Sequence, residues 1–154
     1  MKKTIITISR EFGSGGHFIG KEVAKRMNIP YYDKDIIFQI AEKTGYSESF
    51  IQEQSEYAPS KNLFAYAFVG RDRTGSSLSD QVYAAQTQVI KDLAQKGSCV
   101  IIGRCADYIL KDDPDAYHIF VCGNEAEKIA RTQKLFNLSE KEARNMNQDM
   151  DKKR

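Results

Sequence analysis

The segment 10–16 carries the residues whose types and spacing most clearly suggest chemistry. It reads Arg-Glu-Phe-Gly-Ser-Gly-Gly, with three glycines among its last four positions, a composition that destabilises the interior of helices and strands. A β-branched run at 3–9 precedes it, and a helical pattern follows it. At such a turn, backbone N–H groups and the positive end of a helix meet and bind phosphate. The sequence therefore predicts a phosphate site, with a purely structural turn as the alternative; its candidate residues are Arg10, Gly13, Ser14, Gly15, Gly16 and His17.

The lysine of a phosphate-binding loop has no obvious equivalent here. Gly15, Gly20 and Lys21 nearly match the pattern G-x-x-x-x-G-K-[ST], but Glu22 replaces the hydroxyl residue. This register places Gly20 and Lys21 inside the predicted helix. The alternative register, 10–16, keeps the loop beside the strand and puts Gly16 at the lysine position. A substitute cation is then expected from Arg10, from Lys21 or from a distant arginine. Lys21 is a candidate phosphate ligand, with a solvated helix residue as the alternative.

Four short apolar runs predict β-strands, at 3–9, 31–32, 98–103 and 117–122. The last two are apolar without alternation, so we expect both of their faces to be covered. Helical patterns lie between the strands, and strands that alternate with helices pair in parallel. The predicted fold is a three-layer α/β fold, a parallel sheet with helices on both faces. In such sheets the ligand lies beyond the carboxyl ends of the strands.

Apolar spacing and polar caps predict the helices. The first is expected to end before Pro30 and to bury Phe18, Ile19, Val23 and Met27. Asp33 is expected to cap a helix that ends near Gly45. Further helices are expected from Ser47 or Ser49 and over 61–69, with a loop at 70–77. A long helix is expected from Ser77 to Gly97, with an apolar stripe at Leu78, Val82, Ala85, Val89 and Leu93. The last two are expected to begin with capping boxes, one at Asn124 and Glu127 and one at Ser139 and Glu142, the second helix running up to Arg154.

Length and composition exclude several classes of protein. With 154 residues and 17.5 kDa the chain fits one domain. A mean hydropathy of -0.54 and the absence of a long apolar run argue against a membrane protein. The net charge of +2, from 23 basic and 21 acidic residues, argues against nucleic-acid binding. With three cysteines and no secretory signal we expect reduced thiols buried as small core residues, a cytoplasmic location and no zinc site.

Four sequence blocks together resemble one family. They are Ile-Ser-Arg-Glu-Phe-Gly-Ser-Gly-Gly-His at 8–17, Ile-Gly-Lys at 19–21, Tyr-Tyr-Asp-Lys at 31–34 and Val-Ile-Ile-Gly-Arg-Cys-Ala-Asp at 100–107. The chain resembles the cytidylate kinase-like family, a branch of the P-loop nucleoside monophosphate kinases, from residue 4 to residue 154. The resemblance implies one P-loop kinase-like domain over 1–154 with a five-stranded parallel sheet. It also implies an acceptor-binding helical insert at about 33–77 and a closing lid at about 137–154. Family members continue past the lid, so we expect the last strand to be missing from this chain.

The resemblance also implies site residues, cofactors and substrates. It indicates ATP with Mg²⁺ and phosphoryl transfer to a nucleoside monophosphate, with a CMP-like acceptor as the first expectation. The oligomeric state and the metal ligands are not indicated. Asp151 is matched to the lid. The acceptor-binding residues are expected to be Asp33, Arg104 and Asp107, and the catalytic residues Arg104, Arg131 and Arg154.

Departures from the family pattern leave alternatives open. True cytidylate kinases carry Leu-Asp-Thr/Ser-Gly and Gly-Arg-Asp segments; here Lys34 follows the matching Asp33, and Cys105 follows Arg104. A kinase for another small molecule and a nucleotide-sensing module without turnover are therefore alternatives. Plainer readings are a helix cap for Asp33, an ion pair for Arg104 and a solvated helix face for Arg131. A dinucleotide oxidoreductase is the weakest alternative, because the glycines lack G-x-G-x-x-G spacing.

Overall fold

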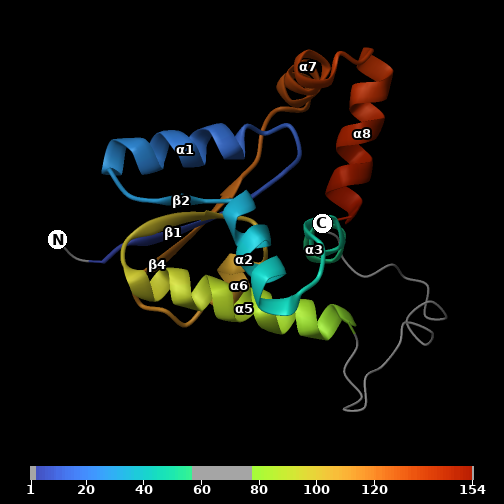
Figure 1. The fold of residues 1–154 in the computed structure, drawn as a ribbon. Helices are drawn as coiled ribbons and strands as arrows, with labels where there is room; N and C mark the ends of the chain where they lie inside the picture. The colour runs from blue at the N-terminus through green and yellow to red at the C-terminus, as the bar shows by residue number, and fades with distance from the viewer. Residues whose placement is uncertain (1–2, 57–77, 154) are drawn as a thin grey trace.

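A parallel sheet forms the centre of the molecule. The computed structural model describes residues 3–56 and 78–153 (Figure 1). The strands are β1 (Ile5–Arg10), β2 (Tyr31–Tyr32), β3 (Cys99–Ile102) and β4 (Ala116–Val121). Their order is β2-β3-β1-β4, and all pairs are parallel. The helix predicted at 61–69, the loop at 70–77, the Ser77 cap and Arg154 lie outside the described residues.

Helix α1 (Gly16–Met27) covers one face of the sheet through small residues. Its buried positions are Gly16, Gly20 and Ala24, whereas Phe18 is 74% exposed. The sequence predicted that α1 buries Phe18, Ile19, Val23 and Met27. This prediction is wrong for three of the four, since only Val23 packs against the core. The reason is close approach: a Cβ at Gly20 would lie 2.5 Å from Ile102 Cδ1. A helix this near the sheet must point its large side chains outward.

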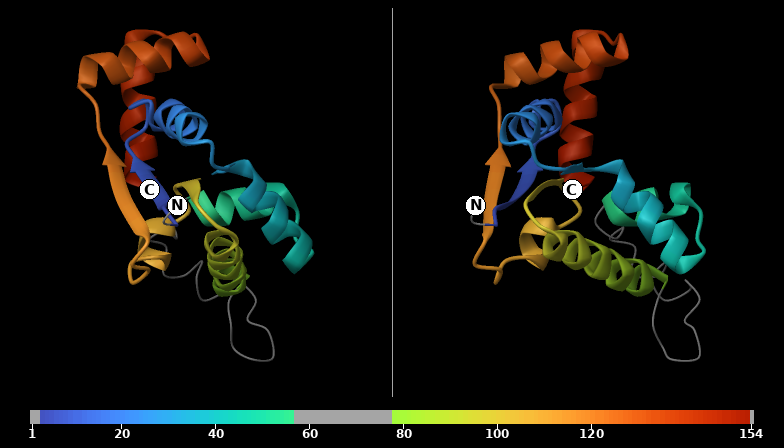
Figure 2. Two further views of the ribbon diagram at one scale, coloured as in Figure 1. Left: turned by 90° about the vertical axis from the view of Figure 1, so that its left-hand side faces the viewer. Right: turned by 60° about the vertical axis from the view of Figure 1, so that its left-hand side comes forward.

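The other face of the sheet is covered by α2 (Lys34–Thr44), α3 (Glu48–Glu56), α5 (Leu78–Lys96) and α6 (Ala106–Ile109). Side chains at successive strand positions point to opposite faces of the sheet. Ile5 therefore packs with these helices, whereas Ile6 packs with α1. The stripe predicted on α5 is confirmed at Val82, Val89 and Leu93, each at most 2% exposed. Helices on both faces give the three-layer α/β arrangement that the sequence predicts (Figures 1 and 2).

Strand β4 differs from its prediction. Among the described residues it pairs with β1 alone, at one edge of the four-stranded sheet. Tyr117 is 54% exposed and Phe120 64% exposed, so the expectation that both faces of this run are covered is wrong. Strand β3, in contrast, is buried at all four positions, as predicted. An apolar run identifies a strand, but it does not distinguish an edge strand from a central one.

Two further helices, α7 (Glu125–Phe136) and α8 (Glu140–Lys153), pack against each other with crossing axes, next to the start of α1 (Figure 2). Asn124 caps α7, since its Oδ1 accepts a hydrogen bond from the Ala126 N–H at 2.9 Å. Ser139 and Glu142 form the predicted capping box, because the N–H and Oγ of Ser139 both donate to Glu142 Oε2, at 2.9 and 2.6 Å. In the described ranges, no helix combines the length and apolar character needed to cross a bilayer.

Candidate functional site

The glycine-rich turn lies between β1 and α1, as predicted. Gly13 and Gly15 have φ of 74° and 88°, the left-handed region that favours glycine. Helix α1 begins at Gly16 with no side-chain cap, so its first N–H groups can bind an anion. Gly20 and Lys21 lie inside α1. The loop is therefore the segment that ends at Gly15, and the register with Lys21 at its end does not describe it.

Helix α7 lies directly against this loop. A Cβ at Gly13 would be 2.9 Å from both the Lys128 carbonyl oxygen and Thr132 Oγ1, so only glycine permits this approach. Arg131 Nη1 donates a hydrogen bond to the Gly13 carbonyl at 2.5 Å. The Arg131 guanidinium also lies over Gly15, 3.2 Å from where a Cβ would be. The structure thus places Arg131, a predicted catalytic residue, along the phosphate loop.

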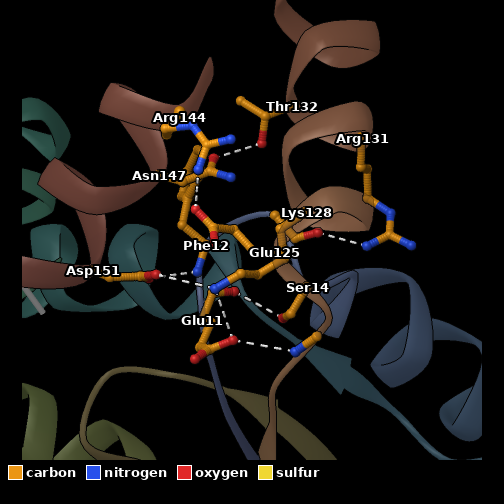
Figure 3. A network of polar contacts seen from close by, with 12 residues as sticks. Glu11, Phe12, Ser14, Glu125, Lys128, Arg131, Thr132, Arg144, Asn147 and Asp151 are labelled. Carbon is orange, nitrogen blue, oxygen red and sulfur yellow. Dashed lines mark hydrogen bonds and ion pairs between the residues drawn. The ribbon is translucent and has the colours of Figure 1, made fainter. Parts of the chain in front are cut away.

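A polar network fixes the rest of the loop to β4, α7 and α8 (Figure 3). Glu11 Oε2 accepts hydrogen bonds from Lys128 Nζ at 3.0 Å and from the Gly123 N–H at 3.1 Å. These partners hold the pKa of Glu11 below its ordinary value. Asp151 Oδ1 accepts a hydrogen bond from the Phe12 N–H at 2.6 Å. The resemblance indicated Asp151 as a lid residue, whereas Glu11 and Lys128 were not identified from the sequence. The only signal for Glu11 was a charged residue inside a glycine loop.

Ser14, a predicted phosphate ligand, uses its hydroxyl within the loop. Its Oγ donates a hydrogen bond to the Glu11 carbonyl at 2.8 Å, and the residue is 8% exposed. The hydroxyl therefore stabilises the turn, and the loop's shape depends on it.

A second polar cluster lies at the start of α1, where β2 ends. His17 Nδ1 is 3.1 Å from Asp33 Oδ2, and Arg10 Nη2 is 3.1 Å from His17 Nε2. Because a guanidinium can only donate, Nε2 accepts and Nδ1 carries the proton that Asp33 binds. Asp33 occupies the N-cap position of α2 but makes no side-chain cap bond, so the predicted capping role is wrong. Its carboxylate binds His17 instead.

The charge of Asp33 is stabilised by several neighbours. Burial alone would raise the pKa of this carboxyl. The hydrogen bond from His17, together with the charges of Arg10 and Arg104, outweighs that effect and holds the pKa below its ordinary value. Asp33 and Arg104, which come from distant parts of the sequence, therefore face the same region.

Arg104 follows β3 in an unusual backbone conformation. Arg104 and Cys105 have φ of 58° and 52°, which is rare outside glycine, asparagine and aspartate. Buried Gln86 of α5, 2% exposed, donates from Nε2 to the Arg104 carbonyl at 2.8 Å. This glutamine supports the turn that presents Arg104. It was not identified from the sequence, where it is one polar residue on an apolar helix.

The remaining predicted residues are placed as follows. Asp107 lies in the first turn of α6, close to Cys105, whose pKa is raised by burial and by Asp107. Lys21 Nζ lies 5.8 Å from the ring centroid of Tyr31, one turn into α1. Of the three free cysteines only Cys99 is buried, so the expectation of core positions is wrong for Cys105 and Cys122. Among the described residues, no three His, Cys, Asp or Glu side chains gather as a metal site.

A parallel sheet of order β2-β3-β1-β4, with a glycine loop between β1 and α1, is consistent with the P-loop NTPase fold. The family model of the cytidylate kinase-like family matches residues 5–154, and the chain belongs to this family. A solved structure of an uncharacterized protein from Eubacterium ventriosum is 30% identical, with a TM-score of 0.65, over 97% of this chain and 72% of that chain. No match was found among curated proteins.

Two more distant structures share the fold. Shikimate kinase from Bacteroides thetaiotaomicron is 17% identical, with a TM-score of 0.55, over 97% of this chain and 77% of its own. The protein TT1252 from Thermus thermophilus is 16% identical, with a TM-score of 0.53, over 97% of this chain and 81% of its own. At these identities the likeness concerns the fold alone.

Proposed function

We propose that this chain transfers the γ-phosphoryl group of ATP to a nucleoside monophosphate, with a CMP-like acceptor. The observation that supports this proposal best is the pairing of two sites at one end of the sheet. The glycine loop with its uncapped helix suits a triphosphate. Arg10, His17, Asp33 and Arg104 lie next to it and suit a phosphorylated, polar acceptor.

On the donor side, positioning and charge neutralisation supply the catalysis. The N–H groups of the loop and of the first turn of α1, from Gly13 to His17, hold the β-phosphate. Arg131 lies along the loop and stabilises charge on the γ-phosphate as its bond breaks. Arg154, which lies outside the described residues, is the proposed lid arginine.

Mg²⁺ would reach this site on the nucleotide. The carboxylates at the loop, Glu11 and Asp151, already accept hydrogen bonds from Lys128, Gly123 and Phe12, and the described residues gather no metal cluster. Phosphate oxygens and water can supply most of the octahedral shell of Mg²⁺, so the residues fit a cation carried by ATP. The chemistry that such a cation would supply is neutralisation of the phosphate charge during transfer.

On the acceptor side, Arg104 binds the acceptor phosphate. A guanidinium matches two phosphate oxygens at once, and the turn supported by Gln86 fixes its direction. Asp33 and Asp107 are proposed to bind polar groups of the nucleoside. Helices α2 and α3 belong to the proposed acceptor insert.

An assay of ADP release tests this function. Purified protein is incubated with ATP, Mg²⁺ and, separately, CMP, dCMP, UMP or AMP. We expect ADP release to rise at least about tenfold over the ATP-only rate with CMP. Arg26→Ala is a suitable control, because Arg26 is exposed and pairs only with Glu22 on the same helix. The absence of acceptor-stimulated ADP release with all four nucleotides would contradict the proposal.

A kinase for a different small acceptor is the second candidate. Cys105 at the position of the family's aspartate favours it, since a thiol cannot replace a carboxylate as a hydrogen-bond acceptor. ADP release with a phosphate-free alcohol but with none of the four monophosphates would assign this activity. Tight ATP binding without any turnover would instead indicate a nucleotide-sensing module.

A further inference from the structure

The lysine position of the phosphate loop has no side chain in this protein. With β1 ending at Arg10, the pattern G-x-x-x-x-G-K-[ST] runs from Arg10 to His17. Arg10 then stands at the first glycine, Gly16 at the lysine and His17 at the hydroxyl residue. Compared with the pattern, the first position carries a cationic side chain, Arg10, where a glycine is usual. The seventh position carries Gly16, where a lysine is usual.

The side chain of Arg10 occupies the space beside Gly16. A Cβ at position 16 would lie 2.8 Å from Arg10 Cβ and 3.0 Å from Arg10 Cγ. Arg10 and a residue with a side chain at position 16 are therefore mutually exclusive in this arrangement. Farther along, Arg10 Nη1 contacts the place where a Cβ at Gly103 would be. Glycines at both ends make room for this one side chain.

Neighbouring groups fix the direction of the Arg10 guanidinium. His17 Nε2 accepts a hydrogen bond from Arg10 Nη2 at 3.1 Å, and Asp33 binds the opposite nitrogen of the same ring. Asp33 therefore selects the tautomer in which Nε2 is free to accept. The guanidinium ends between the start of α1 and Gly103, the residue before Arg104.

We propose that Arg10 replaces the missing loop lysine as the cation that binds the β- and γ-phosphates of the donor, with His17 and Asp33 as positioning residues. This inference rests on the proposed phosphoryl transfer. Arg10 touches the donor loop at Gly16 and reaches the acceptor side at Gly103. A planar guanidinium can donate to two phosphate oxygens at once. This geometry suits a cation that contacts the γ-phosphoryl group while it moves from the donor to the acceptor.

The other nearby cations are placed less well for this role. Lys21 lies over the ring of Tyr31, one turn beyond the loop. Arg131 already donates to the Gly13 carbonyl and lies over Gly15, away from position 16. Lys128 is held by Glu11. Among the cations in the described part of the chain, Arg10 is the one whose side chain packs on the lysine position itself.

A charge-relocation experiment tests the inference. Three variants are compared with the wild type by calorimetric titration of ATP and of AMP: Arg10→Gly, Gly16→Lys and the double variant. Arg10→Gly should weaken ATP binding about 30- to 100-fold and AMP binding less than about threefold, because AMP lacks the β- and γ-phosphates. Gly16→Lys alone should also lose affinity, since its Cβ clashes with Arg10. The double variant restores the usual pattern and should recover at least about tenfold in ATP affinity over Arg10→Gly.

The outcomes separate this inference from the proposed function. A wild type that binds no ATP overturns both. A wild type that binds ATP, with Arg10→Gly binding it equally well, overturns the inference alone. So does a double variant no tighter than Arg10→Gly, or an equal loss in Lys21→Ala, which would assign the cation to Lys21. If Arg10→Gly does not fold, Arg10→Gln removes the charge at similar volume and is expected to show the same selective loss of ATP affinity.

The positioning role of His17 has its own readout. His17→Ala should lower kcat for phosphoryl transfer about tenfold or more, with a smaller effect on ATP affinity, because the cation remains but its direction is lost. His17→Gln, whose amide oxygen can accept from Arg10, should restore most of kcat. Equal kcat values in His17→Ala and the wild type would contradict the role.

Discussion

Asp33 shows how single residues set the properties of this site. Its carboxylate is partly buried, yet His17, Arg10 and Arg104 keep it ionised. A carboxylate in this position holds His17 in one tautomer and balances two arginines that would otherwise repel each other. The phosphates of the proposed substrates would bring further negative charge to the same arginines. The charges of the site are thus arranged for an anionic ligand.

The lowered pKa of Asp33 predicts a pH-dependent stability. A depressed carboxyl pKa stabilises the fold above the unfolded-state value near 3.8, and that contribution disappears as the pH falls through the folded-state pKa. Asp33→Asn should therefore lower the free energy of unfolding at pH 7 by about 1–2 kcal/mol. The difference from the wild type should vanish well below pH 4. Thermal melts from pH 7 to pH 3 measure it, with exposed Asp112→Asn as the control. An effect of Asp33→Asn that is independent of pH would contradict the ion-pair explanation.

Arg104 is expected to act on the acceptor and not on ATP. Arg104→Ala should lower kcat/KM for the acceptor roughly 10²-fold, because the charge-assisted contact to the acceptor phosphate is lost. ATP affinity should change less than about threefold. Steady-state kinetics with CMP measure the effect on kcat/KM, and titration with ATP measures the effect on ATP affinity. Unchanged acceptor kinetics would remove Arg104 from the site.

At the scale of elements, the glycine loop and α7 are in close contact at Gly13. Gly13 combines a positive φ with backbone and side-chain atoms 2.9 Å from its missing Cβ. Before it in the loop, Glu11 accepts a hydrogen bond from Lys128 of α7, and the Phe12 N–H donates to Asp151 of α8. Helices α7 and α8 therefore hold the loop in shape.

Gly13→Ala should measure this contact, with Gly45→Ala as a matched control. Both glycines have φ of 74°, but nothing lies within 4 Å of a Cβ at Gly45. The control should lose about 1 kcal/mol for the left-handed conformation. Gly13→Ala should lose about 1–3 kcal/mol more, because α7 must shift away. Denaturant unfolding of both variants gives the difference. Equal losses of unfolding free energy in the two variants would contradict a close contact between α7 and Gly13.

The element types could be predicted from the sequence, but their burial only in part. Strand β3 and the stripe on α5 are buried as predicted, whereas α1 and β4 are not. Periodicity identified α1, but Gly20 and Ala24 face the sheet because the helix lies too close for Phe18 or Met27. The apolar run of β4 likewise did not reveal that this strand lies at an edge of the sheet with exposed side chains. Asp33 and Arg10 were identified as site residues, yet their link through His17 depends on long-range geometry that spacing does not encode. Gln86 and Lys128 gave no local signal at all.

At the scale of the whole molecule, the glycine loop is where the layers meet. β1 leads into it, α1 leaves it, and β4, α7 and α8 contact it through Glu11, Gly13 and Phe12. The second polar cluster, which contains Asp33, joins it through Arg10 and His17. A ligand in the loop therefore touches elements from both ends of the sequence, and its binding should stabilise the fold as a unit.

The decisive measurement is an NMR titration of ¹⁵N-labelled protein with ADP, which follows each backbone N–H directly. Shifts are expected to be largest at Gly13, Gly15, Gly16 and His17, to saturate together, and to be much smaller with adenosine, which lacks phosphates. Unchanged resonances for these four residues at saturating ADP, or equal shifts with adenosine, would show that the loop does not bind the phosphates.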